Sequence, residues 1–282
     1  MKISTEIGSA TRIIGEEKAI ELIAKAGFDA WDFSMFAMCR YDRENNCLLE
    51  NDHPLAGNNY LAFARQLKKI GLDNGIECNQ SHAPFPIYID EIRSYCKRAI
   101  ECTAEAGGKI CVIHPDNHKS AEENAEIYNE LLPFAKECGV KIATENMFNW
   151  YYGPAPAACS SPESFVEHLK AVDDDYFVAC LDIGHAELKG LKTSAVEMIK
   201  AIGPKLQALH IHDNDKENDK HQIPFSMNID FNAVVNALKE VDYKGDLTLE
   251  ANAYLKEFTE ENIFEGIKNL AESAKKLREM MK

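Results

Sequence analysis

Short apolar segments with the character of β-strands alternate with helical patterns about eight times along this chain of 282 residues. The segments are rich in Ile, Val, Leu, Phe, Ala and Cys, and their weak alternation is typical of strands covered on both faces. Strands that alternate with helices form parallel sheets with crossover helices. The predicted strands span residues 2–8, 30–35, 76–82, 109–114, 139–146, 177–183, 206–212 and 246–250.

Such a sheet is either an open doubly wound sheet or a closed barrel. No GxGxxG turn follows an early strand, which weakens the dinucleotide-binding version of the open sheet. Eight units in a chain close to the roughly 250 residues of a typical barrel favour closure. No linker, low-complexity stretch or composition break divides the chain. We therefore predict the α/β class and one (β/α)8 TIM-barrel domain over residues 1–282.

Helix boundaries are visible at several places between these strands. Asp230 is a plausible N-cap for a helix whose apolar residues 231, 234, 235, 238 and 241 share one face. Ser161 followed by Pro162 has the same form, and residues 120–123 match a capping box. Gly27 is placed to end the first amphipathic helix.

The formal charge of −15 argues against a protein that binds by neutralising phosphates, so nucleic acid is not an expected partner. The nine cysteines are scattered without a CxxC pair, which indicates reduced thiols in a cytoplasmic protein. Cys111 and Cys180 lie in apolar runs and are expected in the core. No apolar run approaches the roughly 20 residues of a membrane span, and the N-terminus lacks the apolar stretch of a signal peptide.

Metal-ligand residue types stand at the ends of most of the later strands. Active sites of such barrels lie at the C-terminal ends of the strands, where side chains from different strands converge. Three carboxylates and an imidazole on consecutive strands are hard to explain by packing, because unpaired buried carboxylates are expensive. They suit a divalent ion such as Zn²⁺ or Mn²⁺. The residues at the ends of the fifth to eighth strands are Glu145, Asp182, His210 and Glu250.

Other residues near the same rim allow more than one interpretation. His82 and His114, each close to a proline, either cap their strands or extend the site toward a second metal. His185 follows Asp182 by three residues and suits either a metal or a substrate hydroxyl. His210 and His212 share one strand face, so spacing does not decide which is the ligand. Asp219 and His221 lie in a polar loop that is either part of the site or a solvated segment.

Two segments longer than a plain barrel requires, Phe36–Gly57 and Asn149–Ser161, are expected as loops over the active-site face. Aromatic residues there and nearby either wall the pocket or simply pack in loops and core. They are Phe33, Phe148, Trp150, Tyr151 and Tyr152. The arginines placed near the predicted mouth are Arg12, Arg40 and Arg43.

Taken in order, these residues resemble the xylose isomerase-like TIM-barrel superfamily, which contains sugar phosphate isomerases and epimerases and endonuclease IV. The resemblance covers nearly the whole chain. The matching motifs are Ser81-His82-Ala83-Pro84, His114-Pro115, Glu145-Asn146, Leu181-Asp182-Ile183-Gly184-His185, His210-Ile211-His212-Asp213-Asn214, Asp219-Lys220-His221 and Leu249-Glu250.

The resemblance implies that Glu145, Asp182, His210 and Glu250 hold the main metal. It selects His210 over His212, because the family's ligand is the first residue of an H-x-x-D unit. In the epimerase branch, Glu145 and Glu250 act as acid and base on opposite faces of a sugar carbon, and His185 contacts a substrate oxygen. The implied function is a metal-dependent sugar or sugar phosphate isomerase or epimerase that transfers a proton through a metal-stabilised enediolate.

The endonuclease IV branch implies a rival function, zinc-dependent phosphodiester hydrolysis at abasic sites in DNA. Its nine ligand positions are matched by the four main ligands together with His82, His114, His185, Asp219 and His221. Against it, Ser226-Met227-Asn228 stands where that pattern commonly has Gly-x-Gly. A catalytically silent barrel that binds a ligand through this face is the third alternative, and the intact carboxylate set argues against it.

Overall fold

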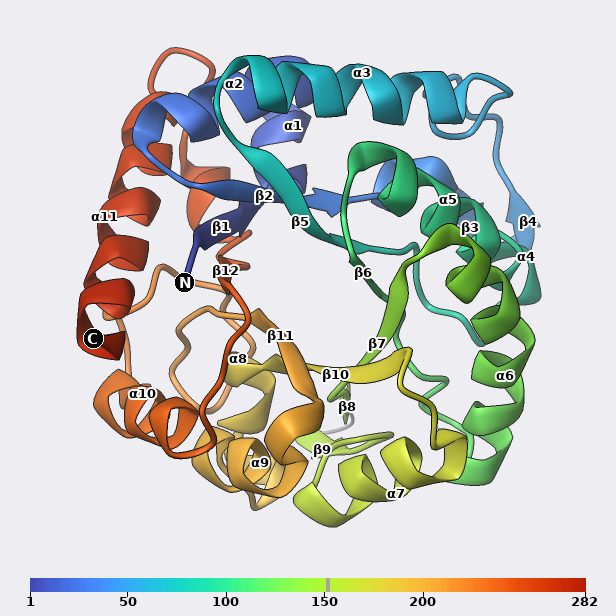
Figure 1. Cartoon of the computed structure of the whole chain (residues 1–282), viewed down its shortest axis with the longest axis vertical. Coiled ribbons are helices and arrows are strands. Elements are labelled where there is room, and N and C mark those ends of the chain that lie inside the picture. The colour runs from blue at the N-terminus through green and yellow to red at the C-terminus, as the bar shows by residue number, and fades with distance from the viewer. Residues whose placement is uncertain (151–152) are drawn as a thin grey trace.

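Eight parallel strands form a ring that the helices surround on the outside (Figure 1). The computed structural model describes residues 1–150 and 153–282. The strand order is β11-β10-β7-β6-β5-β2-β1-β12, and a parallel bridge between Ile211 and Leu249 joins the two ends. The predicted (β/α)8 barrel is therefore confirmed. The strands are β1 (Ile3–Glu6), β2 (Ala30–Ser34), β5 (Glu77–His82), β6 (Ile110–Val112), β7 (Lys141–Glu145), β10 (Phe177–Asp182), β11 (Leu206–His210) and β12 (Leu247–Leu249).

The helices begin and end where the capping residues predict. Asp230 accepts hydrogen bonds from the backbone of Asn232 and Ala233, Ser120 forms a capping box, and Gly27 ends α2 in the left-handed region. The α-helices are α1 (Gly8–Ile14), α2 (Glu16–Ala26), α3 (Tyr60–Asp73), α4 (Asp90–Arg93), α5 (Cys96–Ala106), α6 (Ala121–Cys138), α7 (Pro162–Val172), α8 (Ile183–Ala186), α9 (Ala195–Ile202), α10 (Phe231–Glu240) and α11 (Ile263–Met281). Short 3₁₀ turns are η1 (Phe36–Met38), η2 (Lys189–Leu191), η3 (Gly203–Lys205) and η4 (Tyr254–Glu257).

Apolar side chains fill two separate regions. The larger region contains Trp31 and Phe33, whose rings pack edge to face. The smaller one, inside the barrel, consists of Val112, Ala143, Val178, Cys180 and Ala208. Phe33 is fully buried in the larger region. Because neighbouring residues on a strand face opposite sides, this residue of β2 cannot also face the barrel interior. The pocket-wall interpretation of Phe33 is therefore wrong, and its alternative, core packing, holds.

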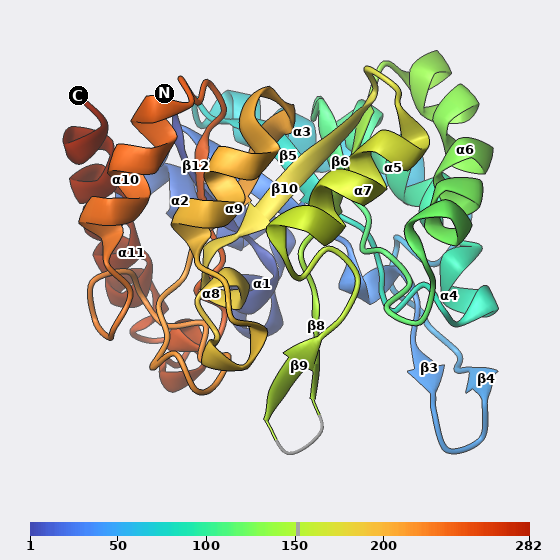
Figure 2. The same cartoon turned by 90° about the horizontal axis from the view of Figure 1, so that it is seen from below.

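The two long segments project from the same end of the barrel, opposite the chain termini (Figure 2). Each contains an antiparallel hairpin that the sequence patterns did not predict, because its strands are only two or three residues long. The hairpins pair β3 (Tyr41–Asp42) with β4 (Cys47–Leu48) and β8 (Phe148–Trp150) with β9 (Pro154–Pro156). The predicted aromatics Tyr151 and Tyr152 lie outside the described residues.

Cys111 and Cys180 are fully buried, as predicted, and burial raises the pKa of the Cys111 thiol to about 11 and that of Cys180 to about 12. Both thiols are therefore protonated at neutral pH and behave as small core residues. None of the helices in the described ranges combines the length and the apolar character needed to cross a membrane.

Candidate metal centre

The four residues predicted as main ligands meet at the C-terminal mouth of the barrel. Glu145, Asp182 and His210 are the last residues of β7, β10 and β11, and Glu250 follows β12 directly. Each has one potential ligand atom within 4.8 Å of those of the other three, and all four residues are buried. His210 Nδ1 lies 3.0 Å from Glu145 Oε1 and 3.7 Å from Glu250 Oε2.

The pairing of the strands explains why these residues meet. Asp182 pairs with His210 across β10 and β11, and Glu145 pairs with Cys180, two residues before Asp182. Residues two apart on a strand face the same side, so Cys180 and Asp182 point into the barrel at successive levels. The strand register thus places a ring of polar side chains directly above the small apolar cluster inside the barrel.

Two carboxylate oxygens in this cluster lack a proper hydrogen bond. Asp182 Oδ2 and Glu145 Oε2 are buried and accept no well-aligned hydrogen bond within the described part of the chain, although His114 Nε2 lies 3.2 Å from Glu145 Oε2. A buried ionised carboxylate without a partner is costly. A divalent cation would remove that cost, and three carboxylates with one imidazole suit Zn²⁺ or Mn²⁺. The residues present therefore fit a metal ion.

Asp32 fixes the orientation of the His210 ring. Its Oδ2 lies 3.3 Å from His210 Nε2 and accepts a hydrogen bond of 2.9 Å from Gln80 Nε2. Asp32 is fully buried inside the barrel, halfway along β2. With Nε2 facing Asp32, Nδ1 is the nitrogen directed at the carboxylates of Glu145 and Glu250. A carboxylate behind a metal-binding histidine commonly sets the ring's tautomer and raises its basicity.

His82 and His114 form a second group against the same glutamate. Their Nε2 atoms are 2.8 Å apart, and both face Glu145 Oε2, at 3.6 Å from His82 and 3.2 Å from His114. The rings of Phe36 and Phe85 pack against this pair. Of the two interpretations left open by the sequence, extension of the site agrees with this geometry, since both imidazoles point at Glu145.

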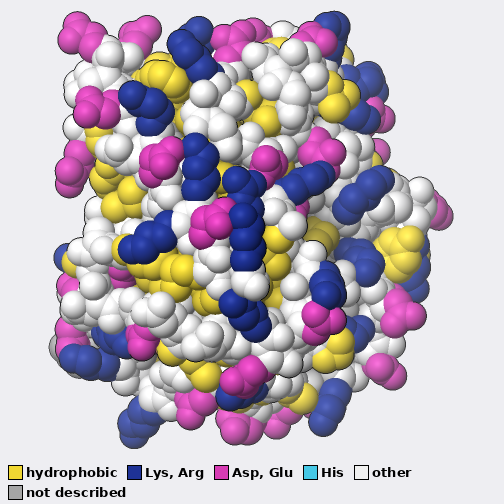
Figure 3. Space-filling view, turned by 60° about the vertical axis from the view of Figure 1, so that its left-hand side comes forward, with side chains coloured by type: hydrophobic (Ala, Val, Ile, Leu, Met, Phe, Trp, Pro, Cys, Tyr) yellow, Lys and Arg dark blue, Asp and Glu magenta, His cyan; other side chains and the backbone are white. Residues whose placement is uncertain are grey.

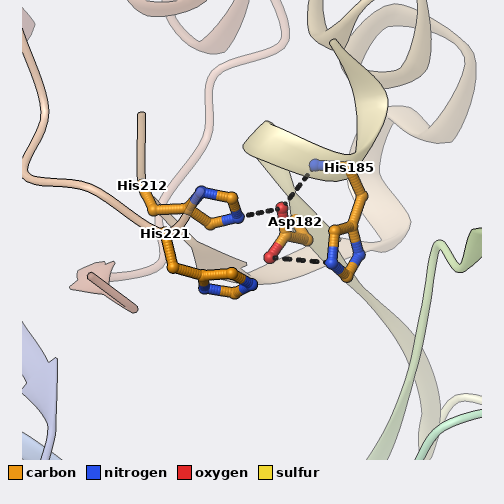
Figure 4. A group of neighbouring side chains, drawn as sticks. All are labelled: Asp182, His185, His212 and His221. Atoms are coloured by element: carbon orange, nitrogen blue, oxygen red, sulfur yellow. Dashed lines mark hydrogen bonds and ion pairs between the residues drawn. The ribbon is translucent and has the colours of Figure 1, made fainter. Parts of the chain in front are cut away.

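A third group surrounds Asp182 (Figure 4). Its members are Asp182, His185, His212 and His221. The Asp182 carboxylate caps α8 by accepting a hydrogen bond of 2.7 Å from the backbone of His185, and the His185 Nε2 lies 3.4 Å from Asp219. His221 Nε2 lies 2.9 Å from the same Asp219 carboxylate. Asp219 and His221 therefore belong to the mouth of the barrel rather than to a solvated loop.

The loop that carries Asp219 and His221 is held in place by one buried carboxylate. Asp213 accepts hydrogen bonds from the backbone of Asn214, Met227 and Ile229, and its own backbone pairs with Gln222. These bonds fix the loop at both ends. The Ser226–Asn228 stretch, which departs from the nuclease pattern, thus keeps a defined conformation without glycine.

His212, which the family resemblance did not select as a ligand, lies against the Asp182 carboxylate. Its Nε2 lies 3.0 Å from Asp182 Oδ1, and its ring stacks on His221 with the centroids 3.8 Å apart. The ring passes so close to Gly184 that a Cβ atom there would collide with it. The signal was present in the sequence, since His212 follows His210 by two residues on the same face.

The pKa values of the two glutamates move in opposite directions. Burial alone would raise the pKa of Glu145, but the charge of His210 and the close contact with His114 hold it well below its ordinary value. Burial raises the pKa of Glu250 against the opposing charge of His210. Burial and the charge of His82 lower the pKa of His114 to about 4, so that imidazole is neutral near pH 7. Carboxyl groups whose pKa values are pushed apart are typical of acid–base pairs.

A cavity of about 250 Å³ opens onto all three groups. Its apolar wall includes Phe148, which agrees with the first of the two interpretations left open for that residue, and the Phe148 ring packs against His185 with the centroids 4.9 Å apart. Trp150 lines a neighbouring hollow and is 53% exposed. A small polar molecule that entered the cavity would therefore contact the ligand residues on one side and aromatic surface on the other.

Comparison with known proteins places the chain in a family. Residues 20–280 match the family model described as xylose isomerase-like TIM barrel, and the chain belongs to that family. The chain is 29% identical to the uncharacterised protein MJ1311 of Methanocaldococcus jannaschii over 82% of this chain and 78% of that protein.

Solved structures share the fold over nearly the full length. A D-tagatose 3-epimerase-like protein superposes with a TM-score of 0.71 at 23% identity, covering 99% of each chain. The IolI protein with a bound zinc atom superposes with a TM-score of 0.73 at 19% identity, covering 98% of each chain. At these identities the likeness establishes the barrel and its topology.

Proposed function

We propose that this protein is a divalent-metal-dependent isomerase or epimerase that moves a proton on the carbon next to the carbonyl group of a small ketose. Glu145 and Glu250 are the proton-transferring groups, and together with Asp182 and His210 they would hold the ion. His185 contacts a substrate oxygen. When bound, the ion would polarise the substrate carbonyl as a Lewis acid and so acidify the neighbouring C–H bond.

The observation that carries this proposal is the pair of buried glutamates at one small cavity. Both line the cavity of about 250 Å³, and both lie within 4 Å of His210 Nδ1, at 3.0 Å and 3.7 Å. General acid–base catalysis needs each group within hydrogen-bond reach of the proton it moves. Glu145, with its lowered pKa, is ionised and suited to accept a proton. Glu250, with its raised pKa, is the better donor on the other side of the substrate carbon.

The likeness to sugar epimerases supports the same reaction class. The D-tagatose 3-epimerase-like protein and this chain share the whole barrel, and the zinc of IolI shows that this fold holds a metal ion. A fold alone does not determine chemistry. The proposal therefore depends on the two glutamates and uses the likeness only to choose ketoses as the first substrates to test.

We expect metal-loaded protein in D₂O to place deuterium on the carbon next to the carbonyl group of its ketose substrate. The proton returned to that carbon passes through a carboxylic acid that exchanges with solvent. Mass spectrometry of a panel of neutral and phosphorylated ketoses would detect the label, and chelator-treated protein is the control. If every ketose stayed unlabelled with excess Zn²⁺ or Mn²⁺ present, the proposed reaction would be refuted.

A zinc-dependent nuclease is the second candidate, and the convergence of three ligand groups favours it. Glu145 faces both His82 and His114, and Asp182 faces His185. Histidines therefore flank the central group, Glu145, Asp182, His210 and Glu250, on two sides. The formal charge of −15, however, argues against it, and on the outer side of the barrel shown in Figure 3 Lys and Arg side chains are spread among Asp and Glu. A nuclease would need a positive track along its substrate.

Metal analysis and a nicking assay separate the two candidates. We expect one exchangeable ion per chain and no cleavage of duplex DNA that contains an abasic site. Three tightly held zinc ions together with cleavage would establish the nuclease and displace the isomerase. A matched duplex without the abasic site controls for contaminating nucleases.

A further inference from the structure

A second cavity, of about 320 Å³, lies beside the metal centre and is lined by three cations. Arg12 comes from α1, Arg43 from the turn between β3 and β4, and Lys256 from η4. Segments that follow three different barrel strands thus each bring a positive charge to one hollow. This is unexpected in a chain whose formal charge is −15.

These cations form no ion pair within the part of the chain that the structure describes, and no carboxylate lines their cavity. No carboxylate is among the residues that line the cavity, whose polar members besides the cations are Tyr41, Cys39 and Asn252. Neither arginine nor Lys256 forms an ion pair with a described residue, whereas other surface lysines do, such as Lys189 with Glu217. Like charges that share a hollow without acids repel one another, and a bound anion would remove that repulsion.

The cationic cavity adjoins the cavity at the metal centre. Phe36, Phe85 and Asn252 line both cavities, and Asn252 follows Glu250 by two residues. A molecule whose carbonyl end lies between Glu145 and Glu250 would extend along these shared walls into the cationic cavity. The far end of the substrate is therefore the part that meets the three cations.

We propose that Arg12, Arg43 and Lys256 form a subsite for a terminal anionic group of the substrate, with a phosphate ester as the main ligand. This inference rests on the proposed function and adds the substrate class to it. Arginine presents a planar fork of donors that suits phosphate or carboxylate oxygens, and lysine adds a point charge. A phosphate ester and the carboxylate of a sugar acid share this chemistry, so the test includes both.

The test compares ligands that differ only in the anion. Isothermal titration of the metal-loaded protein with a ketose, its terminal phosphate ester and the corresponding keto acid measures three affinities. We expect the phosphate ester to bind at least tenfold more tightly than the neutral ketose, and inorganic phosphate to compete with the ester. Arg12→Gln and Arg43→Gln should each lower the ratio of these affinities by roughly tenfold, the effect of losing hydrogen bonds to a charged group. Lys256→Gln should lower it less.

Arg40→Gln is the matched control, because Arg40 is exposed next to the same hairpin but does not line the cavity. The subsite is wrong if Arg40→Gln lowers the ratio as much as the cavity variants, or if the neutral ketose binds as tightly as the ester. Preference for the keto acid over the ester would reject phosphate as the main ligand. The inference would also be overturned if the Arg12, Arg43 and Lys256 variants bound duplex DNA more weakly than the wild type while their affinities for the ketose and its ester were unchanged.

The outcome is separable from that of the proposed function. Binding of inorganic phosphate that depends on the three cations would support the subsite even if no ketose were labelled in D₂O. If replacing Arg12, Arg43 or Lys256 left the labelling of the phosphate ester unchanged at limiting concentration, the reaction would be upheld and the subsite refuted.

Discussion

Glu145→Gln is expected to lower turnover of the substrate by at least about a thousandfold, since a glutamine side chain neither accepts nor delivers the transferred proton. The fold should persist, because glutamine has nearly the same shape and Glu145 sits at the end of β7, above the apolar cluster in the barrel. Steady-state kinetics at saturating metal measure the loss. Circular dichroism and thermal melting verify the fold.

The matched control is Glu137→Gln, the same change on the exposed surface of α6. It should leave turnover within about twofold of the wild type, as surface substitutions away from special features usually do. Metal content is measured for both variants, which separates loss of the proton-transferring group from loss of the ion. A Glu145→Gln protein that kept its metal and more than about a tenth of normal turnover would contradict the assignment.

Asp32→Asn is expected to weaken metal binding by roughly ten- to a hundredfold, the usual effect of removing a carboxylate behind a metal-binding histidine. Asparagine preserves the size of the side chain and its contact with Gln80, but it removes the negative charge 3.3 Å from His210 Nε2. The imidazole then becomes a weaker base and its ring less firmly oriented. Competition with a chromogenic chelator measures the affinity.

Asp52→Asn serves as the control for charge, because Asp52 is exposed in the loop between β4 and α3. The absorption spectrum of the cobalt-loaded protein gives a second readout, which reports the ligand geometry rather than overall stability. If the Asp32 variant bound metal with wild-type affinity and an unchanged cobalt spectrum, Asp32 would have only a packing role.

The strand ends were predictable because two independent signals coincide there. Apolar segments locate the strands, and a carboxylate or histidine at the exit of a buried strand has no packing explanation. Because the strands of a barrel are parallel, their exits share one rim, and residues as distant in sequence as Glu145 and Glu250 are brought together. The resemblance of the motifs then indicated which of these residues are expected to hold the main metal, and it selected His210 over His212. The barrel and the convergence of the predicted ligand residues at its mouth were thus accessible from sequence alone.

Asp32 and Phe33 show what the sequence left undetermined. They are neighbours on β2, so one faces the barrel interior and the other the helices, but no local signal says which. The choice depends on the other strands of the ring, which place Gln80 and His210 opposite Asp32. A carboxylate between Trp31 and Phe33 is itself unusual in a buried strand, and that signal was missed.

The hairpins and the His212 ring depend on contacts between segments remote in sequence. Strands of two or three residues have too few positions to show an alternating pattern. The two-residue spacing from His210 indicates the face on which His212 lies, but the room for its ring depends on the absence of a side chain at Gly184, in a remote segment. Such close approaches are properties of the folded barrel.

Glu145 presents one oxygen to His210 and the other toward His82 and His114, so a single carboxylate belongs to two ligand groups. Occupancy on its two sides is therefore thermodynamically linked. A cation or proton taken up on one side withdraws electron density from the other, and each event changes the affinity for the other by the same factor. The charge state of His82 and His114 would thus help to set how strongly Glu145, Asp182, His210 and Glu250 hold an ion.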